Sequence, residues 1–592
     1  MIDKEVARLF DRRSALFLTG GVVLTSVLVM RMLQMQLFNY RDYTKKSQNN
    51  SYRMQLDMAV RGQILSANGN PISRDAPIYR IYIIPEESKD VDALVDTVAS
   101  NLGLREKAIK SIKKKINKQP KFQPVLVSEN ATWGDLAKIQ AKNLAGLHVE
   151  SGYGRVYEMG PAGAQVFGYV GAPNKSVPNA PFFTMGVTGL EKRYDNTLAG
   201  TPGQTVMITN AVGRVTGEDK TQFIPSIPGS DITTTIDDNI QRKLYDALTQ
   251  HRAGAGVAME IATGNVLAMV STPSFDPNMF RAVDGDEYIS TLRNDFAKPF
   301  MNKAIEGLYP PGSTFKIVVA LAGLESGAIN PKEKIYCPGH WDYGDRRYHC
   351  WEDEGHGKVD LYGALKHSCD IYFYQMALRI GIDAIKAMAL RLGFTEKFMD
   401  DVLAREMSGV MPDRKWKEKN VGVKWVHGDT IISGIGQGFI LANCLQLATM
   451  MARVTSNSVV VPKIIKDSKG PRFSPLRLKD KNIKHVLKGL EQVLQRGGTA
   501  SGSAVNVNGM KMGGKTGTFQ VRSISKKERE SGVLTNEQLK WSMRNHGLFV
   551  GYAPLENPKY AVCVVTEHSG SSTPAARTAA TIMRELLKKD VK

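Results

Sequence analysis

Residues 308–327 read LYPPGSTFKIVVALAGLESG, and this stretch decides how the rest of the chain is interpreted. Two prolines and a glycine before Ser313 are typical of a helix start, and the apolar run that follows predicts a helix buried on all sides. Ser313 and Lys316 lie three positions apart, so they share one face of the first helical turn. A lysine that burial has deprotonated can act as the base for such a serine. The stretch predicts a nucleophilic serine, although a helix-capping serine with a surface lysine fits the same pattern.

Two more motifs follow in the chain and favour the catalytic interpretation. The sequence SCD (368–370) opens SCDIYFYQMA, which predicts a turn leading into an apolar helix. The sequence KTGT (515–518) lies in a strand-like run after two glycines. S-x-x-K, S-D-N and K-T-G, in this order, are shared by the penicillin-recognising serine enzymes. The candidate catalytic residues are therefore Ser313, Lys316, Ser368, Asp370, Lys515, Thr516, Gly517 and Thr518.

These motifs, with several longer stretches, resemble a class B penicillin-binding protein, the monofunctional D,D-transpeptidase type. The stretches are RGQIL (61–65), GVTGLEKRYDNTLAGTPG (186–203) and NHGLFVGYAP (545–554). SCDIYFYQ and GDTIISGIGQG (428–438) are similar to penicillin-binding protein 2 of the cell-elongation branch rather than to the division branch. Asp370 departs from the general pattern, which has Asn. Its hydrogen-bond role stays open, because a carboxylate accepts but does not donate.

The resemblance implies a peptidoglycan stem peptide ending in D-Ala-D-Ala as the donor substrate, and β-lactams as inhibitors. Ser313 would attack the carbonyl between the two D-Ala residues, Lys316 would take the hydroxyl proton, and Ser368 would relay it to the leaving amine. Backbone N–H groups of Ser313 and Thr518 would form the oxyanion hole. An acceptor amine would then resolve the acyl-enzyme, with D,D-carboxypeptidase activity as a side reaction and no cofactor for the chemistry. The residues implied at the donor's terminal carboxylate are Lys515, Thr516 and Thr518.

Three alternatives remain open at this point: a division-type class B transpeptidase, a membrane-anchored β-lactamase and a β-lactam-binding sensor. A β-lactamase needs a base for the hydrolytic water, and residues 369–515 contain no ExxLN-type loop to supply one. A sensor needs several membrane spans, whereas this sequence predicts one. Turnover of penicillin would separate a β-lactamase from a transpeptidase.

The N-terminal segment predicts a single uncleaved membrane anchor. Residues 14–30 read SALFLTGGVVLTSVLVM without a charge, and the helix can continue to residue 37 with Arg31 reaching the interface. No small-residue cleavage site follows. The basic residues that precede the run place the N-terminus in the cytoplasm and the catalytic domain in the periplasm, as expected for a single-pass protein of the inner membrane. These basic residues are Lys4, Arg8, Arg12 and Arg13.

Composition and patterning predict the domain organisation. The 592 residues are 42% hydrophobic and 23% charged with a net charge of +20, which excludes a disordered chain, a coiled-coil rod and a polytopic membrane protein. The basic residues are scattered and lack the aromatic interleaving of a nucleic-acid-binding module, so we expect no nucleic acid partner. The expected partners are stem peptides, β-lactams, the membrane and, by resemblance, the polytopic glycan polymerase of the elongation complex.

The expected fold is α+β, a serine β-lactamase-like transpeptidase domain with helices packed on an antiparallel sheet. A helix over 237–251 and a hairpin over 254–275 with its turn at 263–265 open this domain. Before it we expect an extended, mostly-β pedestal with little core, a hairpin turn at Asn68-Gly69 and one helical stretch over 90–118. The predicted divisions are a cytoplasmic tail (1–13), the anchor (14–37), the pedestal (38–235) and the transpeptidase domain (236–592).

Cysteine spacing predicts a metal site between the first two motifs. Cys337, Cys350, His356 and Cys369 follow the pattern C-x12-C-x5-H-x12-C, and three thiolates with one imidazole suit structural zinc. A metal at Cys369 would fix the second motif, which surrounds it. A Cys337–Cys350 disulfide or free thiols are the alternatives, and His340, His349 and His367 are other possible ligands. Structural roles are expected for His546, Trp425, His427, Asp429, Glu191, Cys444 and Cys563.

Overall fold

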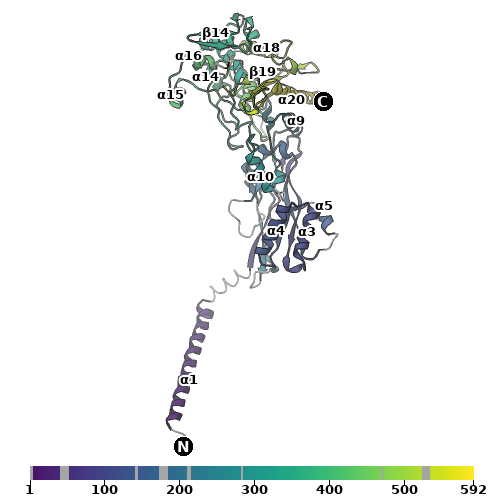
Figure 1. Ribbon diagram of the computed structural model, residues 1–592, viewed down its shortest axis with the longest axis vertical. Coiled ribbons are helices and arrows are strands. Elements are labelled where there is room, and N and C mark those ends of the chain that lie inside the picture. Colours follow the sequence, from purple (N-terminus) through teal and green to yellow (C-terminus); the bar gives the residue numbers. More distant parts are fainter. Residues whose placement is uncertain are drawn as a thin grey trace. The chain divides into compact units, whose positions relative to one another are not determined.

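The computed structural model of the chain is shown in Figure 1. The chain divides into two compact units, the first from residues 1–60, 172–184 and 200–229, and the second from the remaining residues. The described residues are 4–39, 52–131, 133–140, 144–172, 184–209, 215–281, 285–467, 470, 472–522, 528 and 534–591.

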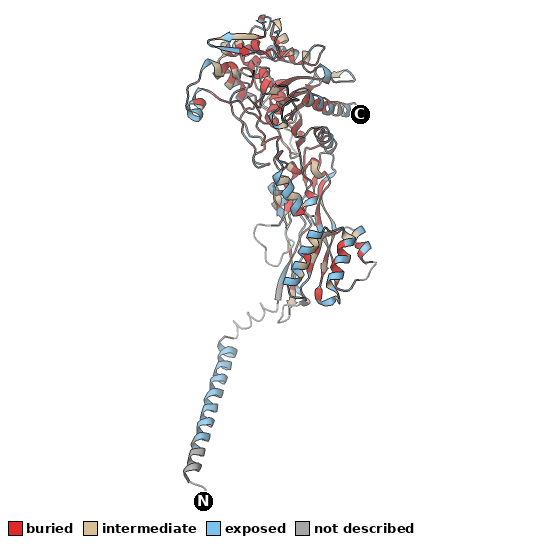
Figure 2. Ribbon diagram, in the orientation of Figure 1, coloured by how far each residue is buried: buried red, intermediate tan, exposed pale blue. Residues whose placement is uncertain are grey.

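The first unit begins with a long exposed helix. Helix α1 (Lys4–Leu33) continues into a π-helical turn, η1 (Gln34–Phe38). The segment 13–38 contains an 18-residue window with a mean hydropathy of 1.9, none of which is buried, and its 26 residues are enough to cross a bilayer (Figure 2). The predicted anchor, 14–37, lies inside this segment. The unit's sheet is antiparallel with the order β1 (Tyr52–Asp57), β8 (Gly203–Thr209) and β9 (Val215–Ile224). The sequence TPGQTVMITNAVGRV (201–215) has the pattern of a strand, and its residues 210–214 lie outside the described residues.

In the second unit, the predicted hairpin turn at Asn68-Gly69 joins the first two strands. Gly69 has a φ of +82°, which a side chain would strain, and the chain reverses there into a long strand. This long strand, β3 (Pro71–Ile83), pairs with β5 (Leu147–Tyr157) over residues 73–83 and with β4 (Val125–Ala131) over residues 79–83. The sheet consists of β10 (Ile232–Thr233), β2 (Ile64–Leu65), β3 (Pro71–Ile83) and β4 (Val125–Ala131) in that order, with β5 (Leu147–Tyr157) also paired to β3.

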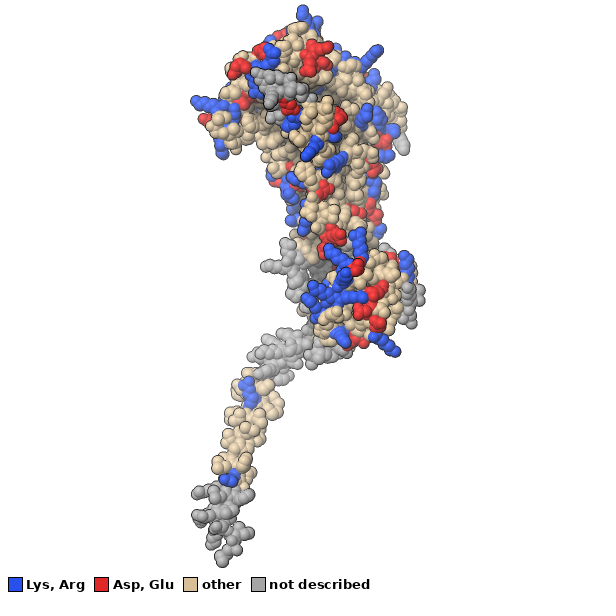
Figure 3. All heavy atoms as spheres, in the orientation of Figure 1, with Lys and Arg blue, Asp and Glu red and all other residues tan. Residues whose placement is uncertain are grey.

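The helical pattern predicted over 90–118 is confirmed, and Gly103 divides the stretch into α3 (Val91–Leu102) and α4 (Glu106–Lys118). Gly103 ends α3 in the left-handed conformation, at φ +65°, and donates its N–H to the last turn. The expectation of little core is wrong here. Both helices and α5 (Trp133–Gln140) bury apolar side chains against β3 and β4, among them Leu94, Val95, Val98, Ile112, Ile81 and Ile83. The exposed face of α4 is rich in lysine (Figure 3).

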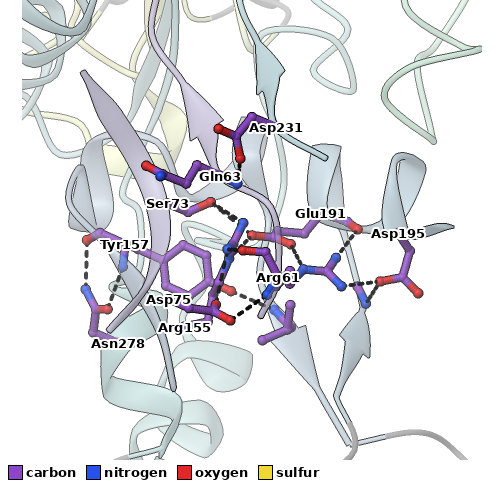
Figure 4. A network of polar contacts seen from close by, with 12 residues as sticks. Arg61, Gln63, Ser73, Asp75, Arg155, Tyr157, Glu191, Asp195, Asp231 and Asn278 are labelled. Carbon is purple, nitrogen blue, oxygen red and sulfur yellow. Dashed lines mark hydrogen bonds and ion pairs between the residues drawn. The ribbon is translucent and has the colours of Figure 1, made fainter. Parts of the chain in front are cut away.

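A buried ionic network lies beside the first hairpin, and its centre is Glu191 of α7 (Gly189–Arg193) (Figure 4). The Glu191 carboxylate accepts from Arg61 Nε and from Arg155 Nε, each at 2.7 Å, and from Ser73 Oγ at 3.0 Å. A buried carboxylate needs such paired charges, because an unpaired one is costly in a low dielectric. The structural ion-pair role expected for Glu191 is confirmed. Asp195 and Asp75 complete the network against the outer sides of the two arginines.

A five-stranded antiparallel sheet forms the core of the region after residue 230. Helices pack on this sheet, as predicted, and they cover both of its faces: Phe549 points into the cluster with α9 and α20, whereas Leu548 and Val550 point into the cluster with α11, α13 and α17. Neighbouring residues of a strand face opposite sides, so a strand buried on both sides is apolar throughout. The predicted hairpin turns at Gly264. The strand order is β12 (Val266–Thr272), β11 (Gly254–Glu260), β21 (Tyr560–Thr566), β20 (His546–Ala553) and β19 (Gly513–Phe519).

Strand β19 is the edge of this sheet, so one side of its backbone remains available to the nucleophile region. The helices described after residue 230 are α9 (Asp238–Leu248), α10 (Gly285–Asn294), α11 (Lys316–Ser326), α12 (Leu361–Lys366), α13 (Asp370–Ile380), α14 (Ile382–Arg391), α15 (Arg414–Val421), α16 (His427–Ser433), α17 (Cys444–Ser456), α18 (Asp480–Gln492) and α20 (Thr573–Lys589). Short strand pairs are β13 (Ile335–Cys337) with β16 (Gly357–Val359), and β14 (His340–Tyr343) with β15 (Arg346–His349).

Candidate active site

The turn that carries Ser313 lies close to the edge strand β19. Ser313 is half-buried in a short 3-10 helix, η5 (Gly312–Phe315), which leads directly into α11. Gly312 has a φ of +53° and donates its N–H to the carbonyl of Gly436 at 2.9 Å. A Cβ atom on Gly312 would lie 2.9 Å from the carbonyl oxygen of Thr518. The glycine therefore lets the backbone before Ser313 approach the third motif closely.

Lys316 joins the first motif to the second. Its side chain is fully buried, and its Nζ donates to Ser368 O at 2.9 Å, to Ser368 Oγ at 3.2 Å and to Asp370 Oδ1 at 2.7 Å. Ser368 has a positive φ of 56°, a strained conformation for a residue with a side chain, between α12 and α13. The strained turn aims both the carbonyl and the hydroxyl of Ser368 at the same ammonium group.

Asp370 also accepts a second hydrogen bond, on its other oxygen. The backbone N–H of Trp351 donates to Asp370 Oδ2 at 3.1 Å, and the indole N–H of Trp351 donates to the carbonyls of His367 and Ser368. Burial raises the pKa of the Asp370 carboxyl, and the nearby Lys316 ammonium opposes that rise. Trp351 was not predicted from the sequence. Its hydrogen bonds hold the backbone and the carboxylate of the second motif in place, although its side chain is 56% exposed.

The third motif completes the cluster from β19. Lys515 is fully buried, and burial followed by the charge of Lys316 lowers the pKa of Lys515 well below its ordinary value. Thr516 is 5% exposed and Thr518 is half-buried. A Cβ atom on Gly517 would lie 3.0 Å from the carbonyl oxygen of Pro311, so this glycine packs against the nucleophile turn. The structure thus brings all three predicted motifs together at one sheet edge.

Gly436 is a second residue that the sequence did not single out by itself. It has a φ of +70°, and its Cβ atom would lie 2.2 Å from Gly312 O. Its only sequence signal is its place in GDTIISGIGQG (428–438). Gly436 therefore supports the nucleophile turn from behind, at a distance that admits no side chain.

The predicted structural residues near the site make structural contacts. His427 bonds to Tyr343 Oη at 2.7 Å, and Asp429 pairs with Lys417 at 2.6 Å. Burial, and then the neighbouring imidazole of His568, lower the pKa of His546 to about 3. Its Nδ1 accepts the backbone N–H of His568 at 2.8 Å. Cys444 and Cys563 are buried.

The predicted metal ligands converge in space. One ligand atom from each of Cys337, Cys350, His356 and Cys369 lies within 4.8 Å of the others. His356 Nδ1 is 3.7 Å from Cys337 Sγ and 3.5 Å from Cys350 Sγ. The three cysteines of the cluster are free thiols, so no disulfide joins Cys337 to Cys350. The other candidate ligands, His340, His349 and His367, are not members of this cluster of described residues.

The cluster is tied directly to the second motif. The backbone N–H of Asp370 points at Cys350 Sγ at 3.4 Å, and Cys369 itself stands between Ser368 and Asp370. Hydrogen bonds from Cys369 and His356 lower the pKa of the Cys350 thiol to about 3 against the effect of burial. The cluster and the catalytic candidates therefore share one stretch of backbone.

Comparison with known proteins agrees with this architecture. Residues 254–588 match the family described as the penicillin binding protein transpeptidase domain, and residues 57–234 match the penicillin-binding protein dimerisation domain. The peptidoglycan D,D-transpeptidase MrdA of Haemophilus influenzae is 31% identical over 98% of this chain and 92% of its own. The protein of the same name from Escherichia coli K12 is 31% identical over 98% of this chain and 94% of its own.

Solved structures are similar over most of the chain. The complex between penicillin-binding protein PBP2 and MreC from Helicobacter pylori covers 91% of this chain and 99% of the matched chain, with a TM-score of 0.72 at 23% identity. Pseudomonas aeruginosa PBP2 in complex with WCK 5153 covers 90% of this chain and 97% of the matched chain, with a TM-score of 0.63 at 29% identity. On these matches and on the three assembled motifs, the chain belongs to the class B penicillin-binding proteins, with a transpeptidase domain that follows a dimerisation domain.

Proposed function

We propose that the chain is a serine D,D-transpeptidase that cross-links peptidoglycan stem peptides during cell elongation. Its curated relatives carry the name peptidoglycan D,D-transpeptidase over nearly the whole chain. The observation that carries the proposal is the position of Lys316, one helical turn after Ser313, whose Nζ lies within 3.2 Å of both Ser368 and Asp370. A serine beside a buried lysine is the arrangement that serine acyl-transfer needs.

Acylation begins with Ser313 Oγ attacking the carbonyl carbon between the two D-Ala residues of the donor. Lys316, as the free amine, takes the hydroxyl proton. Ser368, hydrogen-bonded to Lys316 Nζ at 3.2 Å, passes a proton to the amine of the departing D-Ala. An amine of a neighbouring stem peptide then attacks the carbonyl of the acyl-enzyme. The new peptide bond forms, the ester bond to Ser313 breaks, and the Ser313 hydroxyl is restored.

The edge strand binds the donor in this scheme. Backbone N–H groups of Ser313 and Thr518 stabilise the oxyanion, an effect worth about 2.7–4 kcal/mol per donor in other enzymes. Lys515 and the hydroxyls of Thr516 and Thr518 hold the terminal carboxylate of the donor, with Gly517 keeping the strand close to the nucleophile turn. The close approach of Gly312 to the Thr518 backbone, 2.9 Å from an added Cβ, supports this placement of the oxyanion hole.

The test is covalent labelling of the full chain by fluorescent penicillin. Ser313→Ala is expected to abolish labelling, and Lys316→Ala to slow it severely, whereas the control Ser326→Ala at the exposed end of α11 labels normally. Labelling that persists in Ser313→Ala would contradict the assignment. Rapid turnover of penicillin by the wild type would favour the membrane-anchored β-lactamase, and labelling without cross-linking of stem peptides would favour a β-lactam-binding sensor.

The orientation and the domain limits form part of the proposal. The tail (1–13) lies in the cytoplasm, the anchor (14–37) spans the inner membrane, and the pedestal (38–235) and transpeptidase domain (236–592) lie in the periplasm. The basic residues before the anchor support this orientation. Protease added to spheroplasts should degrade the chain beyond the anchor, and a polytopic glycan polymerase of the elongation complex should co-purify with the full chain.

We propose further that Cys337, Cys350, His356 and Cys369 hold a structural zinc ion. A tetrahedral zinc with bonds of about 2.3 Å to sulfur and about 2.0–2.1 Å to nitrogen sets sulfur and nitrogen about 3.5–3.6 Å apart. The two sulfur–nitrogen distances here are 3.7 and 3.5 Å. Such an ion would fix the backbone on both sides of Cys369 and therefore the second motif.

Elemental analysis of protein purified without a histidine tag tests the zinc site. The wild type is expected to hold about one zinc per chain. Cys350→Ser should lose the metal and lower the melting temperature, whereas Cys444→Ser, a matched change of a buried thiol outside the cluster, should keep the metal. Metal-free protein with a Cys337–Cys350 crosslink in its mass spectrum would refute the zinc site.

A further inference from the structure

We infer that Thr499 is a positioning residue for the third motif, whose hydroxyl orients the Thr516 hydroxyl toward the donor's terminal carboxylate. This inference rests on the proposed function and adds a residue to the carboxylate site. It concerns a loop that none of the three motifs contains.

Thr499 links the second motif to the third. It follows α18 in a turn where Gly497 adopts a φ of +76°. Its backbone N–H points at the carbonyl of Lys366 at 3.4 Å, and Lys366 ends α12 just before Ser368. Its Oγ1 lies 2.8 Å from Thr516 Oγ1. One residue therefore contacts both the segment leading into the second motif and the strand of the third.

The charge of the ligand sets the direction of the hydroxyl–hydroxyl bond. A carboxylate only accepts hydrogen bonds, so Thr516 must turn its single hydrogen toward a bound carboxylate. The Thr516 oxygen is then free to accept, and Thr499 is the donor at 2.8 Å. In such a chain each bond polarises the next, so the Thr499 donor strengthens the bond from Thr516 to the ligand.

Burial makes this donor hard to replace. Thr516 is 5% exposed, so water has little access to its oxygen, whereas Thr499 is half-buried. A valine at 499 has nearly the shape of threonine but cannot donate, which leaves the Thr516 hydroxyl without its partner. A serine at 499 keeps the donor and loses one methyl group.

The experiment compares penicillin with its methyl ester, in which the carboxylate is blocked, on the full chain. The limiting acylation rate and the half-saturating ligand concentration are measured for the wild type, Thr499→Val and Thr499→Ser. With penicillin, Thr499→Val should raise the half-saturating concentration about two- to twelvefold, the range for one lost hydrogen bond, at a nearly unchanged limiting rate. With the ester, the same variant should differ little from the wild type, and Thr499→Ser should match the wild type with both ligands.

The contrast between the two ligands separates this role from a merely structural one. An equal loss with penicillin and with the ester would overturn the inference, because a loosened loop weakens both. Unchanged binding of penicillin by Thr499→Val would overturn it as well. A wild-type chain that penicillin does not label at Ser313 would refute the proposed function itself, a different result from either.

Discussion

Replacing Gly436 by alanine is expected to slow acylation by displacing the nucleophile turn. The added Cβ atom would lie 2.2 Å from Gly312 O and 2.6 Å from Phe315 Cβ. Ordinary contact begins about 1 Å farther away, so the turn that holds Ser313 must move by roughly that amount. A misplacement of about 1 Å can cost about a hundredfold in rate. The second-order rate constant for acylation by penicillin should therefore fall about a hundredfold.

A nearby glycine supplies the control. Gly438 has a φ of +80°, close to the +70° of Gly436, but its Cβ atom would meet only Ile432 Cγ2 at 3.5 Å. An alanine at either position pays a left-handed strain of about 1–2 kcal/mol, so the melting temperature should fall in both variants. Only Gly436→Ala should show the fall of about a hundredfold in the second-order rate constant for acylation. Equal acylation rates in the two variants would refute the argument that close packing behind Gly312 positions Ser313.

Three more predictions concern stability and solubility. Glu191→Gln should cost about 3–5 kcal/mol of stability, because it leaves two buried arginines underpaired, whereas Glu158→Gln in an exposed pair should cost no more than about 1 kcal/mol; equal urea midpoints would contradict this. Because the folded-state pKa of His546 is lowered from 6.5 to about 3, the unfolded chain binds more protons as the pH falls below about 6.5. Stability should thus decrease by up to roughly 2 kcal/mol on acidification to about pH 5, and His546→Gln should flatten that dependence. A chain without residues 1–40 should stay in solution without detergent and still react with penicillin.

Local features of the sequence predicted the sheet and the nucleophile helix well. The apolar strands and the turn at Gly264 depend on neighbouring residues, so they are visible in the sequence. The helical pattern over 90–118 was confirmed in α3 and α4, but it did not show the break at Gly103, after which the second helix starts only at Glu106. A glycine inside a helical pattern is often tolerated, and only the packing of α3 and α4 on the sheet shows that this one ends a helix.

The parts of the site that the sequence missed are long-range contacts. Trp351, Gly436 and Thr499 lie in segments distant from the motif residues that they touch, and none belongs to a motif spacing. The fold alone brings Thr499 to the Thr516 hydroxyl, Gly436 to the Gly312 backbone and Trp351 to the Asp370 carboxylate. The cluster of three cysteines and His356 was predicted because thiols are rare in this chain and carry their own chemistry, whereas Gly, Thr and Trp are common residues whose role depends on their neighbours.

The carboxylate of Asp370, which departs from the asparagine of the general pattern, follows from its surroundings. One oxygen accepts from Lys316 Nζ at 2.7 Å and the other from the Trp351 backbone N–H at 3.1 Å. An asparagine has one acceptor oxygen and one NH₂ group, so in either orientation its NH₂ would face a donor. Trp351 in turn directly follows Cys350, whose sulfur meets the Asp370 N–H at 3.4 Å. The residue after Cys350 therefore presents a backbone N–H that needs an acceptor at position 370 in addition to the one that Lys316 uses. An aspartate supplies both acceptors, so Asp370 and the thiol cluster together hold the second motif against Lys316.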